Sequence, residues 1–317
     1  MRVVRNGAEA LFPKKKSVWK QICKNKWTYL FLLPGLIFLL LFSYWPMYGL
    51  TLAFKKFQIS QGILGSPWIN PWYTNFIKLK DDSMFWSAFL NTFRMGFFYI
   101  LTSFPAPIFL ALMVNELRGK KYKKFLQTVY TFPNFLSWVI VGGLMVSFLS
   151  NEGLINTILG VLGFGSMDML SNPGAIRPIL YATNVWKGAG WSSILYLAAI
   201  AGISPDLYEA AEMDGANRFH KMLDITWPSI KPTAVILLIL QIGGIMNNGF
   251  DQILNMVNPV VQNAAEVLDT YIYRKTFQGV PDYGFSTAIG LSKSLINFAF
   301  LLGANKIAKL FGEGGIL

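Results

Sequence analysis

Six largely apolar runs alternate with polar segments along the 317 residues of this chain. The runs cover residues 29–48, 89–114, 125–148, 179–203, 233–254 and 283–304. A helix needs about 20 apolar residues to cross the hydrocarbon core of a membrane, which is ~30 Å thick, and every run reaches that length. The pattern therefore predicts an all-α membrane protein with six transmembrane helices.

The polar segments differ in charge, and this difference predicts the topology. Eight of the 28 Lys and Arg residues lie within residues 1–27, and five more lie within the short segment 118–124. Cytoplasmic segments of membrane proteins carry an excess of Lys and Arg. Both termini and segment 118–124 are therefore expected in the cytoplasm, and the segments 49–85, 151–176 and 255–282 outside. No small-residue cleavage site follows the first run, so we expect a retained helix and not a signal peptide.

The overall composition fits a membrane protein. Hydrophobic residues make up 53% of the chain and charged residues only 14%, against about 25% charged in a typical soluble domain. A net charge of +12 would also suit nucleic acid, but the placement of the charges favours membrane lipid and no nucleic acid. We expect a basic cytoplasmic segment at 1–27, one transmembrane domain at 28–310 and a short cytoplasmic tail at 311–317.

Few residues of this chain suit catalysis or metal binding. Cys23 is the single cysteine and His220 the single histidine, which excludes a disulfide framework and a Cys or His metal cluster. A phosphate-binding loop needs Gly directly before Lys and Ser or Thr. The nearest approach, residues 290–294, lacks that Gly. We therefore expect no catalytic residue, no metal and no cofactor on this chain, and no ATP hydrolysis by it.

A polar, helix-forming stretch at 204–232 separates the fourth and fifth apolar runs. Ser204 can cap a helix, and Pro205 suits the first helical position, where no backbone N–H is needed. Gly215 predicts the end of that helix, because glycine readily adopts the left-handed conformation found there. A second short helix is expected at 218–224, before Pro228 and Pro232 interrupt the pattern. This geometry is typical of a docking element.

The same stretch resembles the EAA loop of ABC-importer permease subunits, and we call residues 204–232 the coupling loop. Eight positions carry the resemblance: Glu209, Ala210, Ala211, Asp214, Gly215, Ala216, Ile225 and Pro228. Trp227 departs from the pattern, since the family more often has Leu there. In the family this loop inserts into a groove of a cytoplasmic ATPase. The alternative is a linker on the inner leaflet, but residues 206–214 carry four acids and no Lys or Arg, which anionic lipid does not attract.

Residues 31–35 and 44–49 are similar to the first span of carbohydrate-uptake permeases, and residues 65–68 to the subgroup that imports complex oligosaccharides. The resemblance implies a type I ABC-importer permease-like fold in a bacterial inner or plasma membrane. It also implies a second homologous permease subunit, two ATPase subunits that bind ATP and Mg, and an extracytoplasmic solute-binding protein. In similar importers one of the two permeases can hold the substrate alone, so the resemblance leaves open whether this chain or its partner contacts it.

Polar residues within the apolar runs are candidates for a pathway that an oligosaccharide substrate follows. A charge at the centre of a bilayer costs ~2.5–3.5 kcal/mol on insertion scales, so such residues normally face water or the bundle interior. Hydrogen-bonding and aromatic side chains together suit sugars. Two alternatives remain: charged groups near the interface extend to water, and polar groups bind helices to each other. The candidates are Arg94, Asn184, Trp186, Lys187, Trp191, Gln241, Asn247, Asn248 and Lys293.

Two other functions compete with a sugar-importer subunit. A stand-alone, ion-coupled secondary transporter would show buried acidic residues and paired inverted repeats. Here every Asp and Glu falls in a loop, a tail or the end of a run. An ABC permease for a non-sugar solute is the other alternative, and the likeness in the first run decides against it. An intramembrane enzyme is disfavoured, since no nucleophile–base pair is present.

Overall fold

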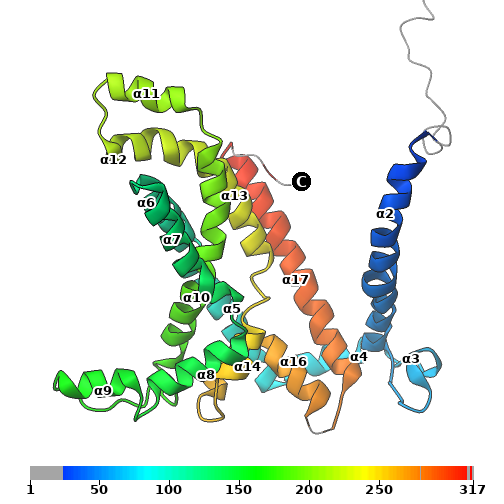
Figure 1. Ribbon diagram of the computed structural model, residues 1–317. Coiled ribbons are helices and arrows are strands. Elements are labelled where there is room, and N and C mark those ends of the chain that lie inside the picture. Colours follow the sequence, from blue (N-terminus) through cyan, green and yellow to red (C-terminus); the bar gives the residue numbers. More distant parts are fainter. Residues whose placement is uncertain (1–23, 279, 313–314, 316–317) are drawn as a thin grey trace, which may run out of the picture.

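The computed structural model describes residues 24–278, 280–312 and 315, and these form helices joined by loops (Figure 1). Most of the basic segment 1–27 lies outside the described residues. Five helical runs in the described part are long and apolar enough to cross a membrane: Lys26–Phe54, Ser83–Glu116, Trp138–Val161, Arg218–Gly243 and Tyr283–Leu310. The fourth predicted run is present as the helix α10 (Ile176–Ala201), but it is not among the five. The count of six transmembrane helices and the placement of both termini stay predictions.

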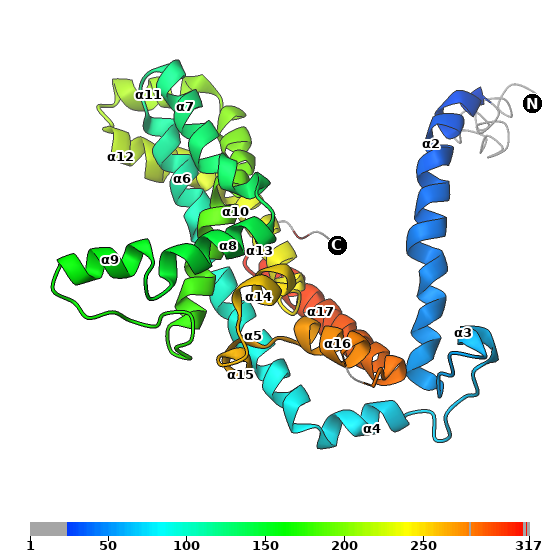
Figure 2. The ribbon, with the colours of Figure 1, turned by 60° about the horizontal axis from the view of Figure 1, so that its bottom comes forward.

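The first helical run stands apart from the rest of the molecule (Figures 1 and 2). It comprises α2 (Lys26–Leu39), a π-helical turn η1 (Leu40–Tyr44) and a 3-10 segment η2 (Trp45–Phe54). No residue of α2 is buried. Within the described residues, the far end of this run is anchored, where η2 packs against α17 (Tyr283–Leu310). The prediction of a helix at 29–48 is confirmed, and α2 presents its apolar side chains outward.

The second predicted run is confirmed, and the third is wrong as a single helix. Residues 83–116 form α5 (Ser83–Ser103) and α6 (Pro105–Glu116). α7 (Lys120–Thr131) then begins inside the segment predicted as a basic loop. A 3-10 turn η3 (Phe132–Phe135) follows, and the helix is interrupted at Leu136, whose backbone is extended. α8 (Trp138–Leu149) then starts in a new direction toward α9 (Leu154–Val161) (Figure 1). Pro133 has no N–H to continue α7, and Ser137 caps α8, which explains the break.

The coupling loop runs into the fifth apolar run without the interruption predicted at its prolines. It contains α11 (Pro205–Met213), α12 (Arg218–Lys221) and a π-helical turn η4 (Met222–Thr226), which continues into α13 (Trp227–Gly243). Pro228 lies in the first turn of α13, where the widened π turn precedes it, so the chain stays helical through it. Pro232 is accepted inside α13.

The predicted fifth span at 233–254 is also wrong as a continuous helix. α13 ends at Gly243, residues 244–249 are not helical, and α14 (Phe250–Met256) resumes beyond them. Short helices fill the segments predicted as external loops: α3 (Gly62–Gly65), α4 (Thr74–Asp81), α15 (Gln262–Ala265) and α16 (Leu268–Phe277). The sixth predicted span is confirmed in α17, which extends past residue 304 to Leu310.

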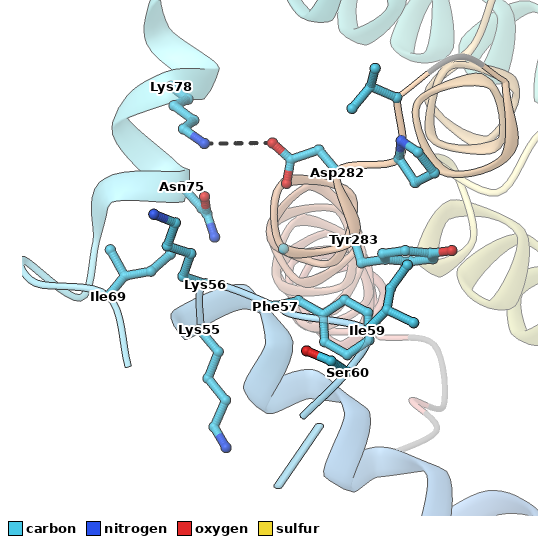
Figure 3. A pocket seen from close by; sticks show the side chains of 13 residues that line it. Lys55, Lys56, Phe57, Ile59, Ser60, Ile69, Asn75, Lys78, Asp282 and Tyr283 are labelled. Carbon is cyan, nitrogen blue, oxygen red and sulfur yellow. Dashed lines mark hydrogen bonds and ion pairs between the residues drawn. The ribbon is translucent and has the colours of Figure 1, made fainter. Parts of the chain in front are cut away.

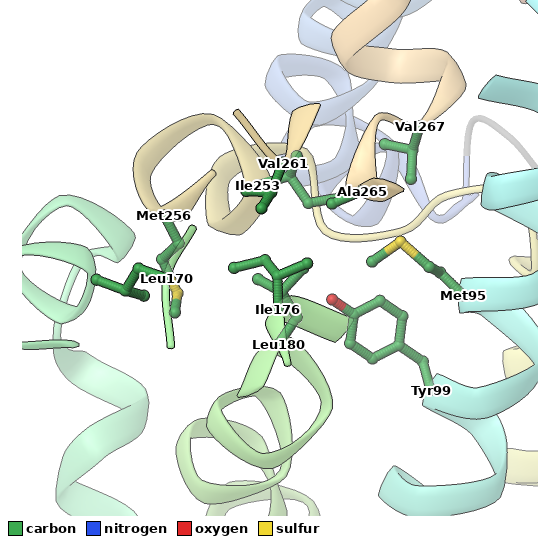
Figure 4. Close-up of a cluster of buried hydrophobic side chains, with 10 residues drawn as sticks. All are labelled: Met95, Tyr99, Leu170, Ile176, Leu180, Ile253, Met256, Val261, Ala265 and Val267. Atoms are coloured by element: carbon green, nitrogen blue, oxygen red, sulfur yellow. The ribbon is translucent and has the colours of Figure 1, made fainter. Parts of the chain in front are cut away.

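Four apolar clusters hold the described helices together, and two of them contain residues of α10. One joins α5, α10 and α14 through Tyr99, Leu180 and Ile253 and neighbouring side chains (Figure 4). The other joins α6, α10 and α13 through Ile108, Tyr196 and Ile230 and lies nearer to the coupling loop. Side chains of this size stabilise a core by about 1.5–3 kcal/mol each when they are fully buried in water-soluble folds. The two clusters therefore fix α10 between the coupling loop and the break in the fifth run.

Candidate functional site

The coupling loop protrudes at one end of the molecule, with α11 beyond the ends of the membrane helices (Figure 1). The Ser204 hydroxyl accepts a hydrogen bond from the Asp206 N–H over 3.4 Å, and Pro205 occupies the first turn. The side chain of Asn217 caps α12 by accepting from the His220 N–H over 2.9 Å. These caps stabilise helices too short to form alone. The sequence prediction of two short helices at this place is confirmed.

Gly215 turns the chain between α11 and α12 through a backbone conformation that other residues avoid. Its φ is +78°, in the left-handed region. The Gly215 N–H donates to the Glu212 carbonyl over 3.1 Å, and the Ala216 N–H donates to the Ala211 carbonyl over 2.8 Å. This pair of hydrogen bonds is the Schellman motif that ends helices. Gly215, Ala211 and Ala216 therefore define the shape of the loop.

Two contacts within the coupling loop join α11 to the segment that leads into α13. The hydroxyls of Tyr208 and Thr226 lie 2.9 Å apart, which joins α11 to η4. An ion pair of 3.7 Å joins Lys221 to Glu212, and Glu212 is 72% exposed, so it contributes little to stability. A groove of about 590 Å³ separates α11 from α7 and α10, and both Lys123 and Glu209 line it. α11 is thus held by the Tyr208 contact, and its side that faces the groove remains accessible.

The predicted coupling residues fall into two groups by exposure. Glu209, Ala210, Asp214, Gly215 and Pro228 are exposed, whereas Ala211, Ala216 and Ile225 are partly buried. Four large apolar side chains that the sequence reasoning did not single out are also exposed on the loop: Leu207 (52%), Met213 (88%), Phe219 (61%) and Leu223 (44%). Exposed apolar side chains next to acidic residues are typical of a protein interface. Large apolar residues in an otherwise polar stretch of the sequence were a readable signal for them.

The break at 244–249 is a second candidate site, because its non-helical backbone is held by contacts with α5 and α17. The side-chain oxygen of Asn297 in α17 accepts a hydrogen bond from the Met246 N–H over 3.0 Å, and its amide donates to Asn247 over 3.1 Å. The Asn248 amide donates to the Thr92 carbonyl over 3.4 Å. A Cβ at Gly96 of α5 would collide with Asn248 and Ile245, so α5 and the break are in close contact. Non-helical backbone at membrane depth occurs where it is buried in protein or lines water.

A buried hydrogen-bond network fixes α14 just beyond the break. The Tyr99 hydroxyl donates to the side-chain oxygen of Gln252 over 2.8 Å. The Gln252 amide donates to the Leu180 carbonyl over 2.8 Å and to the Thr183 hydroxyl over 2.7 Å. Satisfied buried networks of this kind specify one arrangement of helices. Sequence reasoning missed Tyr99, Thr183 and Gln252, because a polar residue in an apolar run does not reveal its partner.

Several candidate pathway residues already have partners within the described chain. Lys187 donates to the Asn134 carbonyl over 2.8 Å and lies over the Trp138 ring, so it closes the break between η3 and α8. Lys293 forms an ion pair of 2.5 Å with Asp269 of α16. Trp191 packs edge-on against Phe135 at 5.7 Å. These contacts fit the alternative that polar groups bind helices to each other.

The other candidate pathway residues have fewer polar contacts within the described residues. Arg94 is exposed on α5 and forms no hydrogen bond or ion pair within the described residues. The side-chain oxygen of Gln241 is buried without a hydrogen-bond partner there, close in sequence to the break. Trp186 is 45% exposed and lines a groove between α6, α7 and α10. Asn184 is partly buried. The structure brings Gln241, Asn247 and Asn248 to the break, and the pathway role of all nine candidates stays a prediction.

Comparison with known proteins decides the family. Residues 76–311 match the family model described as binding-protein-dependent transport system inner membrane component. The chain belongs to this family. It is therefore an inner-membrane permease component of a bacterial binding-protein-dependent ABC importer and not an enzyme, as predicted from the coupling loop.

Curated relatives and solved structures agree with this assignment. The permease is 41% identical over 305 residues to the polygalacturonan/rhamnogalacturonan transport system permease protein YteP of Bacillus subtilis, covering 96% of this chain and 94% of the relative. It is 39% identical to the protein LplB of Bacillus subtilis, with 98% of both chains covered. A crystal structure of a bacterial alginate ABC transporter, in complex with an alginate pentasaccharide-bound periplasmic protein, contains a chain that is 38% identical with a TM-score of 0.85. That match covers 95% of this chain and 100% of the other.

Proposed function

We propose that this permease is one of two permease subunits of an ATP-driven importer of oligosaccharides. Its relatives are named for polygalacturonan, rhamnogalacturonan and arabinooligosaccharides, and its structural neighbour for alginate. A solute-binding protein outside the membrane delivers the oligosaccharide. ATP and Mg bind to two separate ATPase subunits, since the residues for a phosphate-binding loop are absent from this sequence.

The observation that carries the proposal is the protruding α11 with its exposed acids and apolar side chains. Met213 is 88% exposed and Phe219 61% exposed at the end of the molecule (Figure 1). Glu209 lies on α11 with Met213, whereas Phe219 belongs to α12, and Glu209 can pair with a basic residue of an ATPase subunit. An exposed apolar side chain in a rigid, capped loop is suited to a pocket of a partner. The contact of Tyr208 with Thr226 carries a displacement of α11 to α13.

The isolated position of α2 supports a second permease subunit. The run Lys26–Phe54 has none of its most apolar window buried within this chain. Lipid covers part of such a surface, and a homologous subunit that packs beside it covers the rest. The two subunits together enclose the pathway. At the break 244–249, Asn247 is exposed and Asn248 partly buried within this chain, so Asn247 is accessible to that pathway.

The test is co-purification of the tagged permease from gently solubilised membranes. We expect a second six-span permease and an ATPase to accompany it. Glu209→Lys reverses a charge at the proposed contact and is expected to lose the ATPase while it keeps the second permease. Glu152→Lys, an exposed acid in the segment before α9, is the matched control and keeps both. A permease that purifies alone with full uptake activity contradicts the proposal.

A further inference from the structure

A second pocket lies at the end of the molecule opposite to the coupling loop (Figures 1 and 3). Its volume is about 590 Å³. Loop 55–60, α4 and the segment 280–284 line it, so residues as far apart in sequence as Lys78 and Asp282 meet there, 204 positions apart. If the coupling loop faces the ATPase, this pocket faces the side from which the substrate arrives.

Hydrogen bonds hold the walls of the pocket in place. The Lys56 N–H donates to the Pro67 carbonyl over 2.9 Å, and the Ile69 N–H donates to the Phe54 carbonyl over 3.0 Å. The Asn75 amide donates to the Ala53 carbonyl over 2.9 Å, which fixes α4 on η2. A Cβ at Gly284 would lie only 2.8 Å from the Asn75 amide nitrogen, so α17 also packs closely there. The pocket is therefore preformed, which lowers the entropic cost of binding.

The charges around the pocket leave it positive. Lys55 is buried, and its ammonium group donates to the carbonyls of Ile63 (2.8 Å) and Leu64 (3.2 Å). This ammonium group therefore stabilises the loop and is not available to a ligand in the pocket. Lys56 is exposed and forms no side-chain hydrogen bond or ion pair within the described residues. Lys78 lies 3.5 Å from Asp282, with both side chains about half exposed. Two lysines thus face one carboxylate across the pocket.

The single carboxylate is already engaged by the start of α17. The side chain of Asp282 accepts a hydrogen bond from the Phe285 N–H over 3.0 Å and caps this helix. The positive end of the helix dipole offsets part of its charge. Lys78 is therefore only weakly held by Asp282, and its ammonium group remains able to bind an anion beside Lys56.

Aromatic side chains form the remaining wall. The rings of Phe57 and Tyr283 meet edge-on with centroids 5.2 Å apart, beside Ile59 and Ser60 (Figure 3). An aromatic surface beside hydrogen-bonding groups suits a sugar ring, and ammonium groups suit a carboxylate. We propose that this pocket binds a carboxylate-bearing sugar unit of the oligosaccharide before it enters the pathway. The inference rests on the proposed function, because it names the substrate class of the same importer.

The test compares a charged sugar with its neutral counterpart in the complete importer, reconstituted in proteoliposomes. The probes are trigalacturonate and its methyl ester, which keeps the hydroxyls and loses the charges. Lys56→Gln and Lys78→Gln are each expected to raise the KM for trigalacturonate about two- to fivefold, as for partly exposed ion pairs. The KM for the methyl ester stays unchanged. Lys80→Gln, an exposed lysine of α4 that does not line the pocket, is the matched control and changes neither.

One further variant moves the affinity in the opposite direction. Asp282→Asn keeps a side-chain oxygen to cap α17 but removes the competing charge, so it is expected to lower the KM for trigalacturonate. Equal effects of the lysine variants on the KM for both probes, or no effect on either, would contradict the proposal that this pocket binds a sugar carboxylate.

A direct binding measurement separates the pocket from the importer function. Trigalacturonate is titrated against the full chain in lipid nanodiscs at rising NaCl concentration. Binding that weakens at higher NaCl concentration, and also weakens in Lys56→Gln, supports the proposed carboxylate-binding role of the pocket independently of the uptake result. Absence of binding overturns the pocket, and ATP-driven uptake of a neutral oligosaccharide then leaves the proposed function intact.

Discussion

The phenolic oxygen of Tyr208 lies 2.9 Å from the hydroxyl of Thr226, and this contact joins the protruding α11 to the root of α13. Thr226 is buried and is the last residue of the π-helical turn η4. α13 begins with the next residue and ends at Gly243, where the non-helical segment 244–249 starts. A displacement of α11 thus has a short covalent and hydrogen-bonded route to the break.

Removal of the Tyr208 hydroxyl is expected to uncouple ATP hydrolysis from transport. In Tyr208→Phe the ring remains and the contact with Thr226 is lost, at a cost of about 0.5–1.5 kcal/mol. We expect the amount of oligosaccharide taken up per ATP hydrolysed to fall severalfold, while the ATPase still co-purifies. The measurement is uptake and phosphate release in the same proteoliposomes. Tyr122→Phe in α7, a tyrosine that is 56% exposed, is the control and leaves the ratio unchanged.

Gly215→Ala tests the shape of the coupling loop without adding a clash. No atom lies within 4 Å of a Cβ built at this position, so the cost is that of a left-handed alanine, about 1–2 kcal/mol. We expect weaker ATPase binding and lower uptake. Gly163→Ala carries the same backbone cost, with φ +83° and open space around it, but it lies far from the loop in sequence. Equal loss of uptake in both variants would point to general destabilisation.

Gly190 and Gly188 of α10 form a matched pair for helix packing. A Cβ at Gly190 would collide with the backbone carbonyl of Tyr130 in α7, whereas a Cβ at Gly188 meets nothing within 4 Å. Gly190→Ala is expected to separate α10 from α7, at a cost of about 1–3 kcal/mol, and to lower the melting temperature. Gly188→Ala is expected to be neutral or to stabilise α10 by about 0.5–1 kcal/mol. Thermal unfolding in detergent checks both, and identical melting temperatures contradict the packing.

Asp82 gives a pH-dependent test at the end of the molecule that carries α4. Partial burial raises the pKa of its carboxyl, but hydrogen bonds from the Tyr271 hydroxyl and the Phe85 N–H and the charge of Lys275 outweigh burial, so the pKa lies below its ordinary value. The ionised form is therefore stabilised by folding. Its contribution is fully present above the ordinary pKa of about 3.9 and is lost as the pH falls through the lower folded-state pKa.

Asp82→Asn is expected to lower stability at neutral pH by about 1–2 kcal/mol, since it weakens hydrogen bonds to a charged acceptor. The difference from the unaltered chain shrinks as the pH is lowered from about 5 toward 3. Melting temperatures measured across this range check the prediction. Asp81→Asn, the exposed neighbour, serves as control and changes the melting temperature little at any pH. A pH-independent loss in Asp82→Asn contradicts the role of its charge.

The sequence correctly predicted those helices whose apolar run is not interrupted in the structure. It also predicted the two short helices of the coupling loop. Caps and the glycine at 215 are local, so residues 204–217 contain the signals for the start and end of α11 and the start of α12. The breaks at 136 and 244–249 escaped prediction because apolar content continues through them. Their backbone groups are satisfied by Lys187 and Asn297, which come from other helices. Partners that are distant in sequence also decide the positions of Gln252 and Lys293.

The most direct test of the central claim is uptake of a labelled oligosaccharide by proteoliposomes that contain this permease with its co-purified partners and binding protein. We expect uptake that requires ATP and Mg, persists when ion gradients are collapsed, and is lost in Glu209→Lys. Uptake by the permease alone, driven by an ion gradient without ATP, would contradict the account and identify a secondary transporter.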